Sequence, residues 1–222
     1  MNRRKTILFD VDGVLIDSMP IWENSANAYL LQVHGIDAPS YVDKNCETLS
    51  LLEAGEYIKS LYPQITLTPK EIAGGVAEMI RKRYWSVEER PFMKETISWL
   101  KNQDYTLYLA TASETQNVKG ALQNLGVWDE FEDIFTCTDI GYSKNYVAYY
   151  QKTAEKIGMQ CQDLIMVEDS LHSIQTAKKA GLKVVGVYEE YSADKQGQIK
   201  EISDIYIENL GQLPMRLMEN GR

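Results

Sequence analysis

The sequence predicts an α/β protein in which a Rossmann-like parallel sheet is flanked by helices and interrupted by an inserted α-helical cap. Three observations lead to this fold class. Short apolar segments rich in β-forming residues alternate with amphipathic segments, polar residues follow the ends of the apolar segments, and one long helical stretch breaks the alternation. The chain of 222 residues has room for one such domain with an insertion but is short for two full-sized domains.

Four short apolar segments are expected to form strands that are buried on both faces of a parallel sheet. They are Thr6–Phe9, Leu107–Ala110, Leu164–Val167 and Val184–Val187, with a weaker candidate at Ile134–Cys137. Helical segments separate these strands, and right-handed crossovers between parallel strands are the usual result of that order.

The helical segments are recognised by their apolar spacing and by the glycines that follow them. The spacing predicts helices over 18–33, 94–101, 115–125, 146–157 and 170–180. Gly35, Gly126, Gly158 and Gly181 stand just beyond four of these segments. A residue in the left-handed conformation commonly ends a helix at that position, so we expect these glycines to have positive φ angles.

Residues 19–90 break the alternation of strands and helices. They contain no convincing strand, and turns are expected at Tyr62–Pro63 and Thr68–Pro69. We therefore expect two domains, an α/β catalytic core formed by residues 1–18 and 91–222, and a helical cap formed by residues 19–90.

Composition narrows the class of protein. The chain has 23 Lys and Arg against 32 Asp and Glu, a net charge of −9, which disfavours nucleic acid and anionic membranes as partners. Cys46, Cys137 and Cys161 are far apart, form no C-x-x-C pair, and are accompanied by only two histidines. That pattern argues against a disulfide scaffold and against a zinc site. We expect a cytoplasmic protein with no nucleic-acid or membrane partner, and the sequence leaves monomer and dimer both open.

Polar residues follow the ends of three predicted strands. Asp10 and Asp12 follow the first, residues 111–113 end the second, and Glu168 and Asp169 follow the one that begins at Leu164. The carboxyl ends of parallel strands meet at one edge of the sheet, where ligands bind in this class of fold. Clustered carboxylates repel one another unless a cation neutralises them, and an oxygen-only ligand set suits Mg²⁺.

A magnesium site of this composition favours phosphoryl transfer. One carboxylate can attack phosphorus to form an aspartyl-phosphate, and a second can protonate the leaving oxygen and later activate water. The D-x-D-G sequence at Asp10 also begins like a calcium-binding EF-hand loop. That interpretation fails because Val14 and Leu15 stand where the loop needs an oxygen ligand and a glycine.

Four motifs, in order along the chain, resemble those of the haloacid dehalogenase-like hydrolases. Asp10–Ser18 is similar to the first motif of that family, Ala110–Ser113 to the second, Lys144–Gly158 to the third and Val167–Ser170 to the fourth. The resemblance covers nearly the whole chain and is strongest to the β-phosphoglucomutase-like subgroup, whose members carry a helical cap after the first motif.

The resemblance implies a catalytic role for residues in the first three motifs. Asp10 would be the nucleophile and a Mg²⁺ ligand, and Asp12 would be the general acid and base. Asp12 would also bind the metal ion through its backbone carbonyl. Thr111 would hold the phosphoryl oxygens, and Lys144 would offset the charge between nucleophile and phosphate.

The remaining implied residues bind the metal ion and the substrate. Asp169 would complete the metal site, with Glu168 near or on the ion. The substrate, a small phosphorylated metabolite, would contact Thr111, Ala112, Ser113 and, from the cap, Trp22.

The expected function is that of a Mg²⁺-dependent phosphatase. Relatives that cleave carbon–halogen bonds usually lack a carboxylate at the position of Asp12. A sugar-phosphate mutase of the β-phosphoglucomutase type is one alternative, but Trp22 stands where the mutases carry a histidine. The mutases also carry an arginine in the cap, and residues 41–52 contain none. The other alternative is a non-catalytic member of the family, which the complete set of motifs disfavours.

Overall fold

The computed structural model describes residues 5–46, 49 and 51–220 of the chain. The chain divides into two compact units. We call the first, Met1–Asp17 with Glu88–Arg222, the sheet unit, and the second, Ser18–Val87, the helical unit. That the helical unit acts as a cap stays a prediction.

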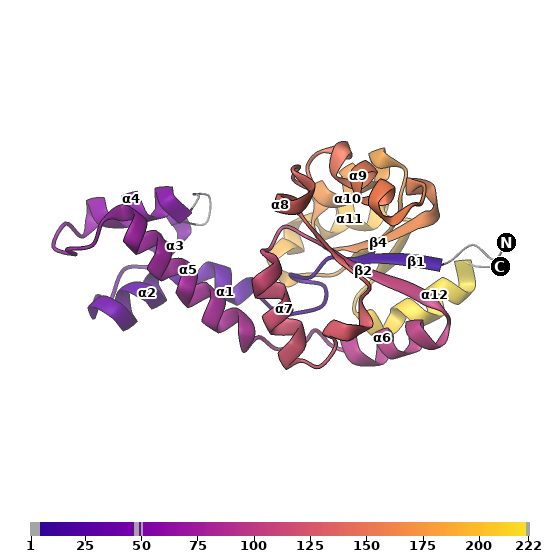
Figure 1. The fold of residues 1–222 in the computed structure, drawn as a ribbon, viewed down its shortest axis with the longest axis horizontal. Coiled ribbons are helices and arrows are strands. Elements are labelled where there is room, and N and C mark those ends of the chain that lie inside the picture. The colour runs from indigo at the N-terminus through magenta and orange to yellow at the C-terminus, as the bar shows by residue number, and fades with distance from the viewer. Residues whose placement is uncertain (1–4, 47–48, 50, 221–222) are drawn as a thin grey trace. The chain divides into compact units, whose positions relative to one another are not determined.

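A parallel sheet forms the centre of the sheet unit (Figure 1). Within the described residues it has six strands in the order β3-β2-β1-β4-β5-β6. Their bounds are Lys5–Phe9 (β1), Tyr105–Thr111 (β2), Ile134–Thr136 (β3), Leu164–Glu168 (β4), Lys183–Val187 (β5) and Ile205–Ile207 (β6). The expected α/β class is therefore confirmed, and β1 lies between β2 and β4, so three of the polar strand ends are neighbours.

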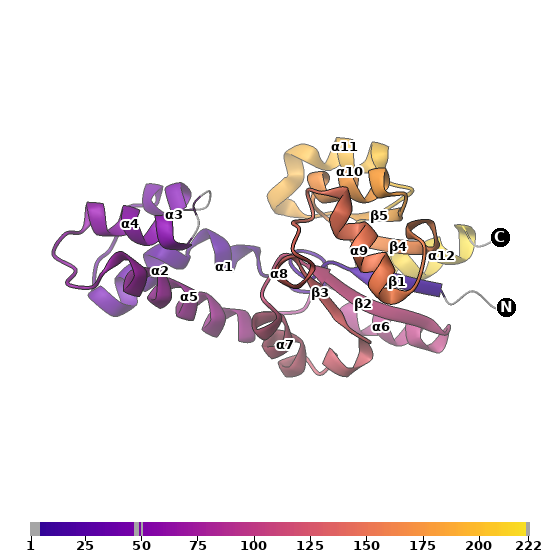
Figure 2. The same ribbon diagram turned by 45° about the horizontal axis from the view of Figure 1, so that its top comes forward.

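Helices cover both faces of this sheet (Figures 1 and 2). The helices α9 (Val147–Ile157), α10 (Leu171–Ala180) and α11 (Gln196–Ile202) lie on one face, and α6 (Met93–Asn102) and α12 (Leu213–Asn220) lie on the other. The remaining helices of this unit are α7 (Thr115–Asn124) and the short α8 (Cys137–Ile140). Apolar side chains of β1, β4 and β5 pack with those of α9, α10 and α11 in one buried core.

The glycines that were expected to end helices have the predicted conformation. The φ angles of Gly35, Gly126, Gly158 and Gly181 are 65°, 75°, 76° and 93°. The expectation rested on local stereochemistry alone, because only glycine enters this region without a Cβ penalty, and it is confirmed.

Two expectations about elements were wrong. No strand was expected at β6, whose three residues lie between the charged Asp204 and Glu208 and pair only with β5 at the edge of the sheet. The single helix expected over 18–33 is broken at Asn24 into α1 (Met19–Glu23) and α2 (Ser25–His34).

The break has a physical cause in the helical unit. The carboxylate of Asp43, in α3 (Tyr41–Cys46), accepts hydrogen bonds from the backbone N–H groups of Ala26 at 2.9 Å and Asn27 at 3.2 Å. These first-turn groups have no partner inside a helix, and an anion near them is stabilising. A contact between residues so far apart in sequence leaves no trace in the periodicity of 18–33.

Two long helices, α4 (Leu51–Leu61) and α5 (Pro69–Trp85), complete the helical unit. Thr68 and Glu71 form a capping box at the start of α5, which satisfies two of its free donors. A Cβ atom on Gly75 would overlap the ring of Tyr29, and one on Gly55 would overlap the carbonyl of Pro69. Close packing of α5 with α2 and with α4 therefore requires glycine at both positions. None of the described helices combines the length and the apolar composition needed to cross a membrane.

The chain leaves and re-enters the sheet unit through two paired segments. Asp17 donates its backbone N–H to the carbonyl of Glu88 at 2.9 Å, and Arg90 donates to Leu15 at 2.9 Å. The guanidinium of Arg90 also donates to the carbonyl of Tyr188 at 3.1 Å and lies 2.9 Å from the carboxylate of Glu189.

Glu189 is only 1% exposed. Burial raises the pKa of this carboxyl, and Arg90 partly offsets that rise. The ion pair thus fastens the returning segment to the end of β5 and neutralises a buried charge.

We expect Arg90→Met to lower the free energy of unfolding by about 3 kcal/mol or more, because it leaves the Glu189 carboxylate buried without its cation. Urea denaturation of single and double variants measures this. Adding Glu189→Gln to Arg90→Met should restore much of the loss, because the buried charge is then gone. The control is Arg216→Met, which removes an exposed ion pair with Glu219 and should cost about 1 kcal/mol or less. Equal losses for the two single variants would contradict this account of Glu189.

Candidate active site

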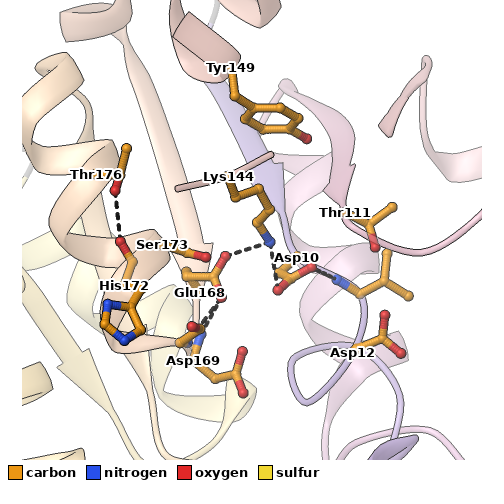
Figure 3. A network of polar contacts seen from close by, with 12 residues as sticks. Asp10, Asp12, Thr111, Lys144, Tyr149, Glu168, Asp169, His172, Ser173 and Thr176 are labelled. Atoms are coloured by element: carbon orange, nitrogen blue, oxygen red, sulfur yellow. Dashed lines mark hydrogen bonds and ion pairs between the residues drawn. The ribbon is translucent and has the colours of Figure 1, made fainter. Parts of the chain in front are cut away.

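The candidate site lies where β1, β2 and β4 end. Asp10 directly follows β1, Thr111 is the last residue of β2, and Glu168 is the last residue of β4, with Asp169 next in the chain. Lys144 comes from the segment between α8 and α9 and points between the ends of β1 and β4 (Figure 3). The parallel order of the strands thus gathers side chains that are far apart in the sequence.

A compact acidic cluster occupies this edge of the sheet. One carboxylate oxygen from each of Asp10, Glu168 and Asp169 lies within 4.8 Å of the other two. All three side chains are buried, and Glu168 has no exposed surface. Three carboxylates at this spacing in a low-dielectric environment repel one another unless a positive charge is present.

Lys144 supplies one positive charge. Its Nζ atom lies 2.7 Å from Oδ2 of Asp10 and 2.6 Å from Oε2 of Glu168. Burial alone would lower the pKa of this ammonium, but Asp10 and then Glu168 raise it well above its usual value. Lys144 therefore stays protonated and bridges two of the three carboxylates (Figure 3).

Glu168 is held from both ends of its carboxylate. Oε1 accepts hydrogen bonds from the backbone N–H groups of Asp169 at 3.2 Å and Ser170 at 3.0 Å, while Oε2 faces Lys144. Both oxygens are thus engaged with the protein itself. Glu168 therefore holds Lys144 in position, and its expected place on or near the metal ion stays a prediction.

The charges of the cluster do not balance. Burial and the charge of Glu168 raise the pKa of Asp10 well above its usual value, and Lys144 offsets this only in part. Burial and the charge of Asp10 raise the pKa of Asp169 to about 7. One ammonium against three carboxylates leaves room for a cation. Because the donors are oxygens only, a hard ion such as Mg²⁺ fits them.

The loop after β1 approaches Asp169 closely. Gly13 has a φ angle of 75°, and a Cβ atom on it would lie 2.5 Å from Oδ2 of Asp169. Glycine is therefore needed there for two independent reasons, the backbone conformation and the space. The loop is held in turn by a hydrogen bond from Gly13 N–H to the carbonyl of Ile16 at 3.0 Å.

The segment after β2 faces the same loop. Thr111 is fully buried, and its Oγ1 accepts a hydrogen bond from the backbone N–H of Ser113 at 3.0 Å. The hydroxyl of Ser113 donates to Oδ2 of Asp12 at 2.7 Å. Ala112 is exposed between them. Three of the four residues expected to bind substrate, Thr111, Ala112 and Ser113, therefore lie at the edge where the acidic cluster lies. The bond from Ser113 to Asp12 was not foreseen.

Trp22 belongs to α1 in the helical unit, and its side chain lies outside the described part of the structure. Its expected contact with substrate stays a prediction.

Sequence reasoning missed Glu189, whose charge further raises the pKa of Asp169. The sequence did contain a signal for it. Glu189 lies two residues beyond the end of β5, so the argument from polar residues near strand ends also points to it.

Residues 7–187 match the family model of the haloacid dehalogenase-like hydrolases. The chain belongs to this family. It is 26% identical over 226 residues to glyceraldehyde 3-phosphate phosphatase from Pyrococcus furiosus, with 96% of this chain and 92% of that protein covered. It is 25% identical over 226 residues to phosphoglycolate phosphatase from Vibrio vulnificus, with 94% of each chain covered.

A solved structure shares the fold of this haloacid dehalogenase-like chain. β-Phosphoglucomutase from Clostridium difficile superposes with a TM-score of 0.71 at 17% sequence identity, covering 98% of this chain and 96% of that one. The similarity confirms the fold over both units. At this identity it carries no information on activity.

We expect Mg²⁺ to stabilise the wild-type protein, because it binds the folded cluster and not the unfolded chain. At a hundred times the dissociation constant the gain is about 2.7 kcal/mol, or roughly 5–10 °C in melting temperature. Thermal unfolding with and without Mg²⁺ measures it.

The variant Asp169→Asn separates metal binding from a general salt effect. Without Mg²⁺ it should melt above the wild type, because one repelling carboxylate has become neutral, and Mg²⁺ should raise its melting temperature much less. Asp133→Asn, an exposed carboxylate outside the cluster, serves as the control. Equal Mg²⁺ shifts for all three proteins would show that the cluster does not bind the ion.

Proposed function

We propose that this chain is a Mg²⁺-dependent phosphatase that hydrolyses a small phosphorylated metabolite through an aspartyl-phosphate on Asp10. The buried cluster of Asp10, Glu168 and Asp169 with Lys144 is the observation that carries the proposal. Membership of the haloacid dehalogenase-like hydrolases and the phosphatase names of two relatives support it. A cytoplasmic location stays a prediction.

The metal ion has an assigned place in this proposal. Asp10 and Asp169 would hold Mg²⁺ through their carboxylates and Asp12 through its backbone carbonyl, while Glu168 keeps Lys144 in position. Mg²⁺ at this point supplies positive charge against the phosphoryl oxygens and the cluster. Lys144, whose Nζ atom lies 2.7 Å from Oδ2 of Asp10, would add to that charge.

The first chemical step is an in-line displacement at phosphorus. An oxygen of Asp10 forms a bond to phosphorus while the bond to the ester oxygen breaks, and the leaving oxygen takes a proton from Asp12. Two contacts of the Asp10 carboxylate support this role, because they hold it in one orientation: Oδ1 accepts a hydrogen bond from the Val11 N–H at 2.7 Å, and Oδ2 faces Lys144 at 2.7 Å. Orientation of the nucleophile before the reaction accounts for a large part of such catalysis.

The second step returns the enzyme to its starting state. Water attacks phosphorus, the bond from phosphorus to Asp10 breaks, and the Asp12 carboxylate accepts the proton of the water. Thr111 and the backbone N–H groups near Ala112 would hold the phosphoryl oxygens during both steps. The helical unit, including Trp22, would close over the substrate and determine which metabolite is accepted.

Hydrolysis is favoured over transfer between two positions of a sugar phosphate. A mutase needs a site for a second phosphate. Trp22 stands where such enzymes carry a histidine, and residues 41–52 contain no arginine. The shared fold with a β-phosphoglucomutase does not change this preference.

We expect Asp10→Asn to lower phosphatase activity by at least about a thousandfold, because an amide cannot act as the nucleophile. The measurement is phosphate release from a panel of small phosphorylated metabolites, with and without Mg²⁺. Asp133→Asn is the matched control and should retain wild-type activity. Substantial Mg²⁺-dependent release by Asp10→Asn would contradict the assignment of the nucleophile. If the wild type releases no phosphate from any member of the panel but isomerises a sugar phosphate in the presence of a sugar bisphosphate, the mutase is favoured instead.

A further inference from the structure

The hydroxyl of Ser113 is hydrogen-bonded to Asp12, a contact that the sequence analysis did not predict. It donates a hydrogen bond to Oδ2 of Asp12 at 2.7 Å, and its own backbone N–H donates to Oγ1 of Thr111 at 3.0 Å. Ser113 is buried at 8% exposure, while Asp12 is half-buried. Since β1 and β2 are adjacent parallel strands, this bond joins the loops that follow them.

The chemistry of a hydroxyl limits what Ser113 does. A serine has a single proton to donate. While the Ser113 hydroxyl donates its hydrogen bond to Asp12, it cannot also donate one to a phosphoryl oxygen of the substrate. A hydrogen bond to an ionised carboxylate is shorter and roughly twice as strong as one between neutral groups.

The two chemical steps need different forms of Asp12. In the first step Asp12 is protonated, and its proton moves to the leaving oxygen. In the second step Asp12 is ionised and accepts a proton from water. Donation from Ser113 matches the second form.

We propose that Ser113 is a positioning residue for hydrolysis of the aspartyl-phosphate, holding the ionised Asp12 carboxylate where it takes the proton of the attacking water. This rests on the proposed function. In the step concerned, the water oxygen forms a bond to phosphorus and the bond from phosphorus to Asp10 breaks. The electron pair of that bond returns to the Asp10 carboxylate, and the proton of the water moves to Asp12. No covalent bond to Ser113 forms or breaks in this step.

Ser113→Ala tests the assignment. Loss of a hydrogen bond to a charged group should slow breakdown of the aspartyl-phosphate about tenfold. Rapid mixing with substrate and acid quenching measures the fraction of phosphorylated enzyme, which should rise. If breakdown limits turnover, kcat and KM should fall together and kcat/KM should stay unchanged, because kcat/KM reports only the steps up to departure of the leaving group.

Two further variants make the test specific. Ser113→Thr keeps a hydroxyl and should restore most of the breakdown rate. Ser60→Ala removes a hydroxyl that bonds to the Tyr57 carbonyl within α4 of the helical unit, and should leave the rate unchanged. Thermal unfolding of each variant identifies any effect that comes from lost stability alone.

Other results would overturn the proposal. A raised KM with unchanged kcat and no accumulated phosphoenzyme would make Ser113 a substrate-binding residue, as its motif implied. A lower melting temperature with an unchanged breakdown rate would make it purely structural. Both results require an active wild type, so they leave the proposed function intact. An inactive wild type under all conditions contradicts the proposed function itself.

Discussion

The ammonium of Lys144, buried between the carboxylates of Asp10 and Glu168, is the interaction on which the rest of the site depends. Its positive charge allows the carboxylates of Asp10 and Glu168 to lie close together although both are buried. Because a third, Asp169, lies within the same cluster, the negative charge is still in excess. A buried excess of this kind destabilises the folded chain and creates affinity for a cation. In the proposed function, the same feature that lowers stability prepares the site for a metal ion and a phosphoryl group.

The fold keeps this cluster in place through many weaker constraints. The register of β1 with β2 and with β4 fixes where the ends of these three strands lie relative to one another. The loop from Asp10 to Asp17 is tied to the segment that returns at Glu88, and Arg90 fastens that segment to the end of β5. Gly13 lets this loop approach Asp169. Backbone hydrogen bonds therefore set the positions of the charged groups, and we expect their side chains to reorganise little in the proposed reaction.

Apolar patterning within short segments predicted much of this architecture. It failed where contacts between residues far apart in the sequence determine the structure. The strands at the centre of the sheet are buried on both faces, so β1 and β4 stand out as apolar runs. Edge strand β6 has no such run. The break in the helix expected over 18–33 depends on Asp43, which no periodicity in that segment reflects. At the site, strand ends indicated Asp10, Glu168 and Asp169, while the bond from Ser113 to Asp12 depends on side-chain geometry that a motif does not specify. The roles of these residues stay predictions.

The most direct test of a covalent aspartyl-phosphate is the stereochemistry at phosphorus. A substrate whose phosphorus carries sulfur and distinguishable oxygen isotopes is hydrolysed, and the configuration of the released thiophosphate is determined. Each in-line displacement inverts the phosphorus. Attack by Asp10 followed by attack of water therefore predicts overall retention. Inversion would show that water attacks the substrate directly and would contradict the account of Asp10 as a nucleophile.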